Sequence, residues 1–203
     1  MDSRVLVELK MELEFGVGPV GDRLPLATNA QDDQPLVLVS RVDDGDLLYL
    51  REDIPARVQR QLRDVGAASC FEDEARVRAI LDTAIPCRIV RCIRWYTVAR
   101  RPDRAEYFDV IRRGDRFVIV IDGREVAWTE TDWENDRAAE VSVETLEGYR
   151  RRGFARQVTA AWAAAMLDAG KVGFYSHRMT NDASRAVAVS LGLTHLSDEV
   201  EYI

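Results

Sequence analysis

The chain has 203 residues, of which 47% are hydrophobic and 31% are charged, and its formal net charge is −7. This composition describes a globular protein that is long enough to bury a substantial core, as one large domain or as a domain with an extension. The acidic balance argues against general nucleic-acid binding and tilts the choice of partner toward a cationic small molecule.

The sequence gives no sign of a membrane segment, a secretion signal or a metal site. No apolar run is long enough to span a bilayer, and the first residues lack the basic-then-apolar pattern of a signal peptide, so we expect a cytoplasmic protein. Cys70, Cys87 and Cys92 have no metal-like spacing, and the chain has only two histidines. We interpret the cysteines as reduced, buried apolar residues.

The first half of the chain carries no recognisable motif, and it predicts an α/β extension of unknown role over residues 1–88. Residues 3–15 fit both a strand alternation and a helical stripe, and we favour the helix because Leu, Glu, Lys and Met are good helix formers. Asp53 is a plausible N-cap for a helix that Gly66 ends. The expected elements are a helix over 3–15, a loop over 16–35, a hairpin of 36–39 and 47–50, helices over 53–66 and 72–83, and extended chain over 87–98.

The second half, residues 89–203, predicts a regular succession of strands and helices. The turn Asp122-Gly123 is the strongest hairpin signal of the sequence. Apolar residues recur every four positions after Gly153, which indicates a long helix, and Gly170 follows where a left-handed cap belongs. The expected elements are a helix over 104–111, strands over 117–121, 125–131 and 139–145, the long helix, another strand, and a short helix that ends at residues 191–193.

A basic turn, Arg150-Arg-Arg-Gly-Phe-Ala155, joins the strand 139–145 to the long helix. Gly153 and Ala155 lack bulk, so the backbone can turn tightly and a ligand can approach its N–H groups. A helix N-terminus attracts phosphate oxygens, and an arginine side chain can place two donors on one phosphate. The turn therefore predicts an anion-binding site.

This turn resembles the pyrophosphate loop of the GNAT superfamily of acyl-CoA acyltransferases, in which Arg-x-x-Gly-x-Ala lies between a strand and a long helix. The later segment from Asn181 through Ser184 to Leu191-Gly-Leu193 resembles the helix that completes the same cofactor site. The resemblance covers roughly residues 107–203, and the whole chain is similar to a bacterial subfamily with a long N-terminal extension.

The resemblance implies an α/β (α+β) fold with a mixed, mostly antiparallel central sheet flanked by helices. It also implies transfer of an acetyl or other acyl group from acetyl-CoA to a primary amine, by direct attack in a ternary complex and without a metal. A backbone N–H near residues 143–145 is expected to stabilise the oxyanion, and Asn181 is expected to cap its helix as well. The residues expected to bind acetyl-CoA are Val143, Thr145, Arg150, Arg151, Arg152, Gly153, Phe154, Ala155, Asn181 and Ser184.

The reaction needs a proton acceptor, because an amine is a nucleophile only when it is unprotonated. Along the strand 139–145, Glu140 and Glu144 should project from the face opposite the valines. We take Glu144 as the first candidate for the base and Glu140 as the second. Both residues also fit solvated strand positions, and a kink in this strand would change which carboxylate faces the cleft.

The residue that often serves as the general acid in the family is absent. GNAT enzymes often place a tyrosine four residues before the glycine at the end of the last helix, and this chain has Ala188 there. Ser184 and Tyr175 are the substitutes, unless the thiolate leaves without a protein acid. His177 lies just past a strand end, and we interpret it as a surface histidine because the sequence shows no partner that would orient it as a base.

Two functions fit these observations. The first is a cytoplasmic N-acyltransferase whose first half shapes the acceptor pocket or a subunit contact in a homodimer, with Trp128 and Trp133 either lining that pocket or packing within a hairpin. The second is a non-catalytic acyl-CoA-binding regulatory or interaction protein, which the alanine at 188 favours. The acceptor, a small amine or a peptide, is not identified by the sequence.

Overall fold

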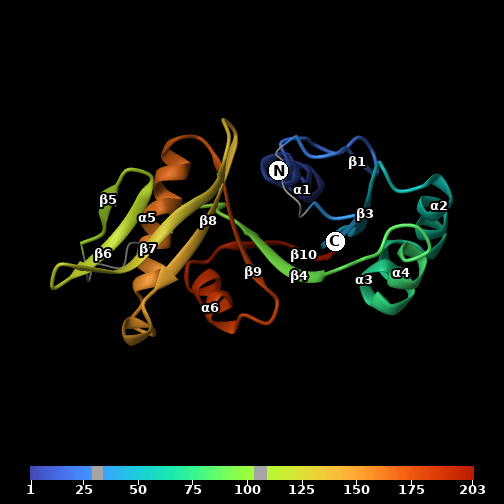
Figure 1. The fold of residues 1–203 in the computed structure, drawn as a ribbon. Coiled ribbons are helices and arrows are strands. Elements are labelled where there is room, and N and C mark those ends of the chain that lie inside the picture. The colour runs from blue at the N-terminus through green and yellow to red at the C-terminus, as the bar shows by residue number, and fades with distance from the viewer. Residues whose placement is uncertain (29–33, 103–108) are drawn as a thin grey trace. The chain divides into compact units, whose positions relative to one another are not determined.

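A computed structural model describes residues 1–28, 34–102 and 109–203 of the chain (Figure 1). The described residues form two compact units, of which one comprises Met1–Arg94 with Leu196–Ile203 and the other comprises Trp95–His195. None of the helices in these residues is long and apolar enough to cross a membrane.

Two strands contribute residues to both units, β4 (Val90–Thr97) and β10 (Thr194–Tyr202). The sequence predicted one boundary, near residue 88, and did not predict the second one, between His195 and Leu196. Nothing in the sequence indicated that residues 196–203 return to the first unit, because strand pairing over such a separation leaves no local signal.

The first unit contains a sheet with the strand order β1-β3-β2-β10-β4. The hairpin of β2 and β3 and the N-terminal helix are confirmed, and β10 pairs antiparallel with β2. The elements of this unit, besides β4 and β10, are α1 (Ser3–Phe15), β1 (Arg23–Leu24), β2 (Val37–Val42), β3 (Gly45–Arg51), α2 (Ala56–Val65), α3 (Ala67–Glu72) and α4 (Glu74–Leu81).

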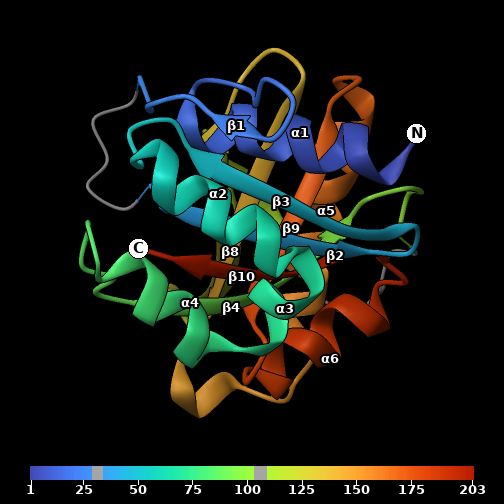
Figure 2. The same cartoon turned by 90° about the vertical axis from the view of Figure 1, so that its right-hand side faces the viewer.

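The side chains of β10 alternate between two different environments of this unit. Val200 and Tyr202 belong to the apolar core that β2 and β3 form with α2, α3 and α4. The three helices lie over this part of the sheet in Figure 2. The Tyr202 hydroxyl donates to the carbonyl oxygen of Cys70 in α3 at 2.7 Å. Glu199 and Glu201 point the other way, and Glu199 meets Lys10 of α1.

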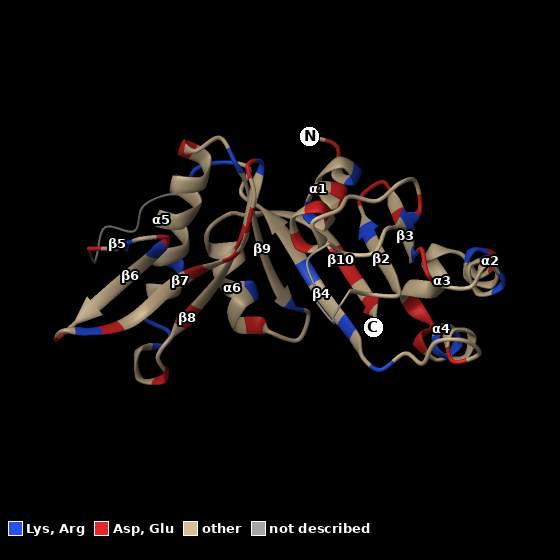
Figure 3. Ribbon diagram, turned by 45° about the horizontal axis from the view of Figure 1, so that its top comes forward, with Lys and Arg blue, Asp and Glu red and all other residues tan. Residues whose placement is uncertain are grey.

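Five ionisable side chains form a buried charge cluster here: Lys10, Glu14, Arg91, Glu199 and Glu201. Nζ of Lys10, which is 0% exposed, lies 2.6 Å from Glu199 and 2.9 Å from Glu14. Nε of Arg91 lies 3.4 Å from Glu201. The acidic bands of β10 lie beside α1 in Figure 3. Three carboxyl groups thus share two cations in a desolvated place, where an unpaired charge is costly.

Three expectations for this unit are wrong in detail. Asp53 does not cap a helix, because its carboxylate accepts a hydrogen bond from Arg51 at 2.7 Å and α2 begins only after Pro55. The helix expected over 72–83 corresponds to α4, which is shorter because the Asp73 carboxylate caps it, and the separate helix α3 before it was not predicted. Cys92 is exposed on β4, whereas the other two cysteines are buried as expected.

The second unit contains a sheet with the order β4-β9-β8-β7-β6-β5. Strands β5 to β8 form an antiparallel meander, and β8 pairs parallel with β9 across the connecting helix α5. The mixed, mostly antiparallel sheet with flanking helices confirms the expected fold class. Its elements are β5 (Ile111–Arg113), β6 (Arg116–Ile121), β7 (Arg124–Glu134), β8 (Ala138–Thr145), a 3-10 turn (Glu147–Tyr149), α5 (Phe154–Asp168), β9 (Val172–Arg178) and α6 (Asp182–Ser190).

Helix α5 packs its apolar face on this sheet, as its four-residue period predicts. Trp162 is fully buried, and its Nε1–H donates to the Thr131 hydroxyl of β7 at 3.1 Å. Gly173 makes this close packing possible, since a Cβ there would lie 3.1 Å from the Trp162 ring and 2.9 Å from Val98. The helix expected over 104–111 falls mainly on residues outside the described part, and Ile111 itself begins β5.

Candidate active site

The parallel pairing of β8 and β9 stops before either strand ends. Its register runs from Ala138–Val172 to Val141–Tyr175, although β8 continues to Thr145 and β9 continues to Arg178. Parallel strands that separate in this way leave backbone groups and side chains facing an opening within the sheet. The opening lies entirely in the second unit.

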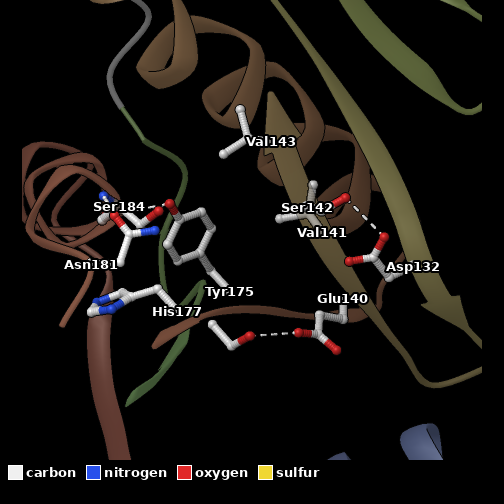
Figure 4. Close-up of a pocket in the computed structure, with 10 residues that line it drawn as sticks. Asp132, Glu140, Val141, Ser142, Val143, Tyr175, His177, Asn181 and Ser184 are labelled. Carbon is white, nitrogen blue, oxygen red and sulfur yellow. Dashed lines mark hydrogen bonds between the residues drawn. The ribbon is translucent and has the colours of Figure 1, made fainter. Parts of the chain in front are cut away.

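A cavity of about 170 Å³ lies at this opening (Figure 4). It is lined by Asp132 of β7, residues 140–143 of β8, residues 175–177 of β9, and Asn181 and Ser184 at the start of α6. Most of these positions come from the strand and helix that the sequence singled out. Asp132 was not predicted.

A β-bulge places Asp132 at the cavity. Thr131 pairs with Val141 and Trp133 pairs with Glu140, so Asp132 is the additional residue on β7. The Ser142 hydroxyl donates to its carboxylate at 2.8 Å. Partial burial of this carboxyl raises the pKa of Asp132, and the nearby Glu130 acts in the same direction.

Only one of the two candidate bases lines the cavity. Glu140 is 7% exposed, and its Oε1 accepts a hydrogen bond from the Ser176 hydroxyl at 2.8 Å. Glu144 is exposed near the end of β8, pairs with Trp128 of β7, and does not line the cavity. The geometry thus favours the second candidate over the first.

Both substitutes for the missing tyrosine lie at the cavity. Tyr175 is 1% exposed, and its hydroxyl donates to the backbone carbonyl oxygen of Ser184 at 3.3 Å. Burial raises the pKa of Tyr175, so this hydroxyl keeps its proton to a higher pH than an exposed tyrosine does. Ala188 is fully buried in the apolar core, so its position offers no proton donor.

The interpretation of His177 as a surface histidine is wrong. It is 6% exposed, lines the cavity, and stacks on Tyr96 with ring centroids 5.7 Å apart. Nδ1 lies 2.8 Å from the carbonyl oxygen of Arg178, which assigns the proton of a neutral ring to Nδ1. Nε2 is buried and has no hydrogen-bond partner in the described part of the chain. The alternation of β9 gave a usable signal, since His177 follows Tyr175 on the same face.

The basic turn forms an open cradle at the N-terminus of α5. Gly153 has a left-handed backbone, no side chain caps the helix, and the first backbone bond is from Gln157 to Gly153. The N–H groups of residues 154–156 therefore lack helical acceptors. A Cβ on Gly153 would meet no atom within 4 Å, so the space beside it is open.

The three arginines of the turn are exposed around this cradle. Nε of Arg150 donates to the carbonyl oxygen of Thr145 at 3.3 Å, and the Arg152 guanidinium lies 5.2 Å from the centre of the Tyr149 ring. Arg151 adopts the left-handed backbone, with a φ of 61°. Open N–H groups surrounded by guanidinium groups are suited to hold a pyrophosphate.

Asn181, Trp128 and Trp133 are the remaining residues for which the sequence predicted a role. Oδ1 of Asn181 accepts from the backbone N–H of Ser184 at 3.1 Å, which confirms the predicted cap. Trp128 packs under the Arg116 guanidinium at 5.4 Å, and neither it nor Trp133 lines the cavity. Within the described residues, no group of three or more His, Cys, Asp or Glu side chains is placed to hold a metal ion.

Residues 104–200 match the family model of the GNAT acetyltransferases. An acetyltransferase from the GNAT family of Colwellia psychrerythraea is 14% identical, with 82% of this chain and 80% of that chain covered and a TM-score of 0.52. A protein described as a GNAT-family acetyltransferase from Novosphingobium aromaticivorans is 18% identical, with a TM-score of 0.49; the match covers 57% of this chain and 65% of that one, just under two thirds. No curated protein sequence matches the chain.

Proposed function

Because residues 104–200 match the family model of the GNAT acetyltransferases, we propose that the protein is an N-acyltransferase that transfers the acetyl group of acetyl-CoA to a primary amine by direct attack in a ternary complex. The observation that carries the proposal is the opening between β8 and β9, where a small cavity meets a buried carboxylate. The anion cradle follows β8 directly in the chain.

The residues of the turn fit the cofactor. The N–H groups of Phe154 and Ala155, beside the bare α carbon of Gly153, would hold the pyrophosphate, and the three arginines would supply its counter-charge. When bound, acetyl-CoA supplies the acyl group as a thioester. The backbone of Val143 and Thr145, past the point where β8 and β9 separate, would bind the arm and the acyl oxygen.

Glu140 is the proton acceptor in this proposal. The amine nitrogen gains the acyl group and loses one proton, and Glu140 is the buried carboxylate that lines the cavity on β8. The Ser176 hydroxyl holds one of its oxygens in place. Glu144 lies outside the cavity and has no role here.

Tyr175 is the proton donor to the departing thiolate. Its hydroxyl lies at the cavity beside the start of α6, next to Ser184, and burial favours its protonated form. A non-catalytic acyl-CoA-binding protein is the competing proposal, and it is favoured by the buried Ala188 where the family often has its acid. Release of free thiol in the presence of amines separates the two.

The cofactor site is tested by calorimetric titration with acetyl-CoA, with dephospho-CoA as the comparison ligand. We expect micromolar binding that Gly153→Asp abolishes, because the new carboxylate would occupy the cradle. Gly114→Asp is the matched control, since Gly114 also has a positive φ and open space but lies in the β5–β6 turn. Equal affinity of the two variants for acetyl-CoA would refute the assignment of the cradle as the pyrophosphate site. Turnover is then followed by thiol release over a set of amines.

A further inference from the structure

The polar side chains that β7, β8 and β9 bring to the cavity present hydrogen-bond acceptors. The Ser142 hydroxyl already donates to Asp132, and the Ser176 hydroxyl already donates to Glu140. The Tyr175 hydroxyl donates to a carbonyl of α6. With these protons engaged, a ligand on this side meets two carboxylates, and no lysine or arginine lines the cavity.

His177 adds an acceptor that no described residue uses. Its ring is 94% shielded, as its exposure of 6% shows, and its Nδ1 proton is engaged by the neighbouring carbonyl. The Nε2 lone pair is therefore buried at the cavity without a donor. Buried acceptors in native proteins nearly always have a partner, either a protein group or an ordered water, so this atom can accept an N–H from a ligand in the cavity.

Asp132 provides the second anchor. The bulge in β7 is what brings its carboxylate to the cavity, and bulges that redirect a side chain are common next to active sites. Partial burial already disfavours the charged form of this carboxyl. A cationic ligand at this position would offset the effect of burial, because an opposite charge stabilises the carboxylate.

We propose that the acceptor is a short alkyl diamine, whose reacting nitrogen lies at Glu140 and whose second nitrogen is bound as an ammonium by Asp132. This inference rests on the proposed function. The reacting nitrogen forms the amide bond as the bond from the acyl carbon to sulfur breaks, its proton passes to Glu140, and the sulfur takes a proton from Tyr175, so that CoA leaves as the thiol. The second ammonium is unchanged. The cavity of about 170 Å³ is smaller than the pockets of roughly 300–1,000 Å³ that hold drug-sized ligands, so its size suits a ligand as small as a short diamine.

The test compares 1,4-diaminobutane with 1-aminobutane at saturating acetyl-CoA. We expect kcat/KM to favour the diamine by about tenfold or more, the effect of one charge-assisted hydrogen bond. Asp132→Asn should remove most of this preference. Asp136→Asn makes the same change of charge in the nearby hairpin, away from the cavity lining, and should retain the preference.

Binding separates this inference from the proposed function. Calorimetry with 1,4-diaminobutane, in the presence of CoA, should show binding that Asp132→Asn weakens and Asp136→Asn does not. Turnover of both amines with equal kcat/KM, or a preference that survives Asp132→Asn, would overturn the diamine assignment and leave the acyltransferase standing. Diamine binding at Asp132 without any thiol release would refute the proposed function and, with it, the role of the diamine as acceptor. Absence of diamine binding and of turnover would reject both.

Discussion

Replacing Glu201 with glutamine is expected to flatten the pH dependence of the stability of the first unit. Glu201 belongs to the buried charge cluster, in which Glu14, Glu199 and Glu201 share Lys10 and Arg91. Burial raises the pKa of Glu201 from 4.5 to about 8, and repulsion from Glu14 acts in the same direction. Near neutral pH, the folded protein therefore holds a proton that the unfolded chain releases.

The sign and the size of the effect follow from this difference. The folded state binds more protons than the unfolded state between the two pKa values, so the free energy of unfolding falls as pH rises from 4.5 to about 8. At about 1.4 kcal/mol for each pH unit, the loss between pH 4.5 and pH 7 is on the order of 3 kcal/mol. Glu14, whose pKa burial also raises, shares this dependence.

The assay is urea unfolding of the wild type and Glu201→Gln from pH 4.5 to pH 8, followed by far-ultraviolet circular dichroism. Glutamine has nearly the shape of the protonated carboxyl and cannot titrate. The free energy of unfolding of the variant should therefore increase relative to that of the wild type as pH rises. Tryptophan fluorescence reports the second unit, because all four tryptophans lie there. Asp64→Asn, at an exposed position of α2, is the control for a lost surface charge. If the wild type and Glu201→Gln lose stability equally as pH rises, Glu201 is not protonated in the folded protein.

The other predictions concern the second unit. Glu140→Gln should lower kcat by about 100-fold or more, the usual scale of general-base catalysis, with the affinity for acetyl-CoA unchanged, and a larger loss in Glu144→Gln would contradict the assignment. Tyr175→Phe should lower kcat by about tenfold at unchanged acetyl-CoA affinity if the thiol takes its proton there, whereas an unchanged kcat would show that the thiolate leaves unaided. His177→Phe keeps an aromatic ring against Tyr96 but removes Nε2, and calorimetry should show weaker amine binding. Asn181→Ala removes the cap of α6 and should cost about 1 kcal/mol in urea unfolding, and no change would mean that the cap contributes nothing.

The features that the sequence predicted well are those with a local cause. The cradle depends on Gly153, whose left-handed backbone few other residues tolerate, and on the helix that begins directly after it. The cap of α6 depends on Asn181 and a backbone N–H three residues later. Short-range requirements of this kind appear directly as residue types at fixed spacing, so the turn at Gly153 and both helices could be located.

The features that the sequence did not reveal depend on pairing between strands. Asp132 reaches the cavity only because β7 has one more residue than β8 in that stretch, and a bulge of this kind has no residue signature. The choice between Glu140 and Glu144 likewise depends on where β9 leaves β8. His177 is buried because Tyr96, far away in the sequence, stacks on it.

The return of residues 196–203 to the first unit has a consequence for biosynthesis. The strand that lies between β2 and β4 in that sheet is translated only after the whole second unit, a delay on the order of ten seconds at ordinary elongation rates. Until then, one edge of β2 has no strand partner, and Lys10 lacks its ion pair with Glu199. An open edge of this kind invites pairing with other chains. During this interval, a chaperone that covers the open edge would favour folding. Termination of translation before residue 196 would leave the edge open and favour aggregation.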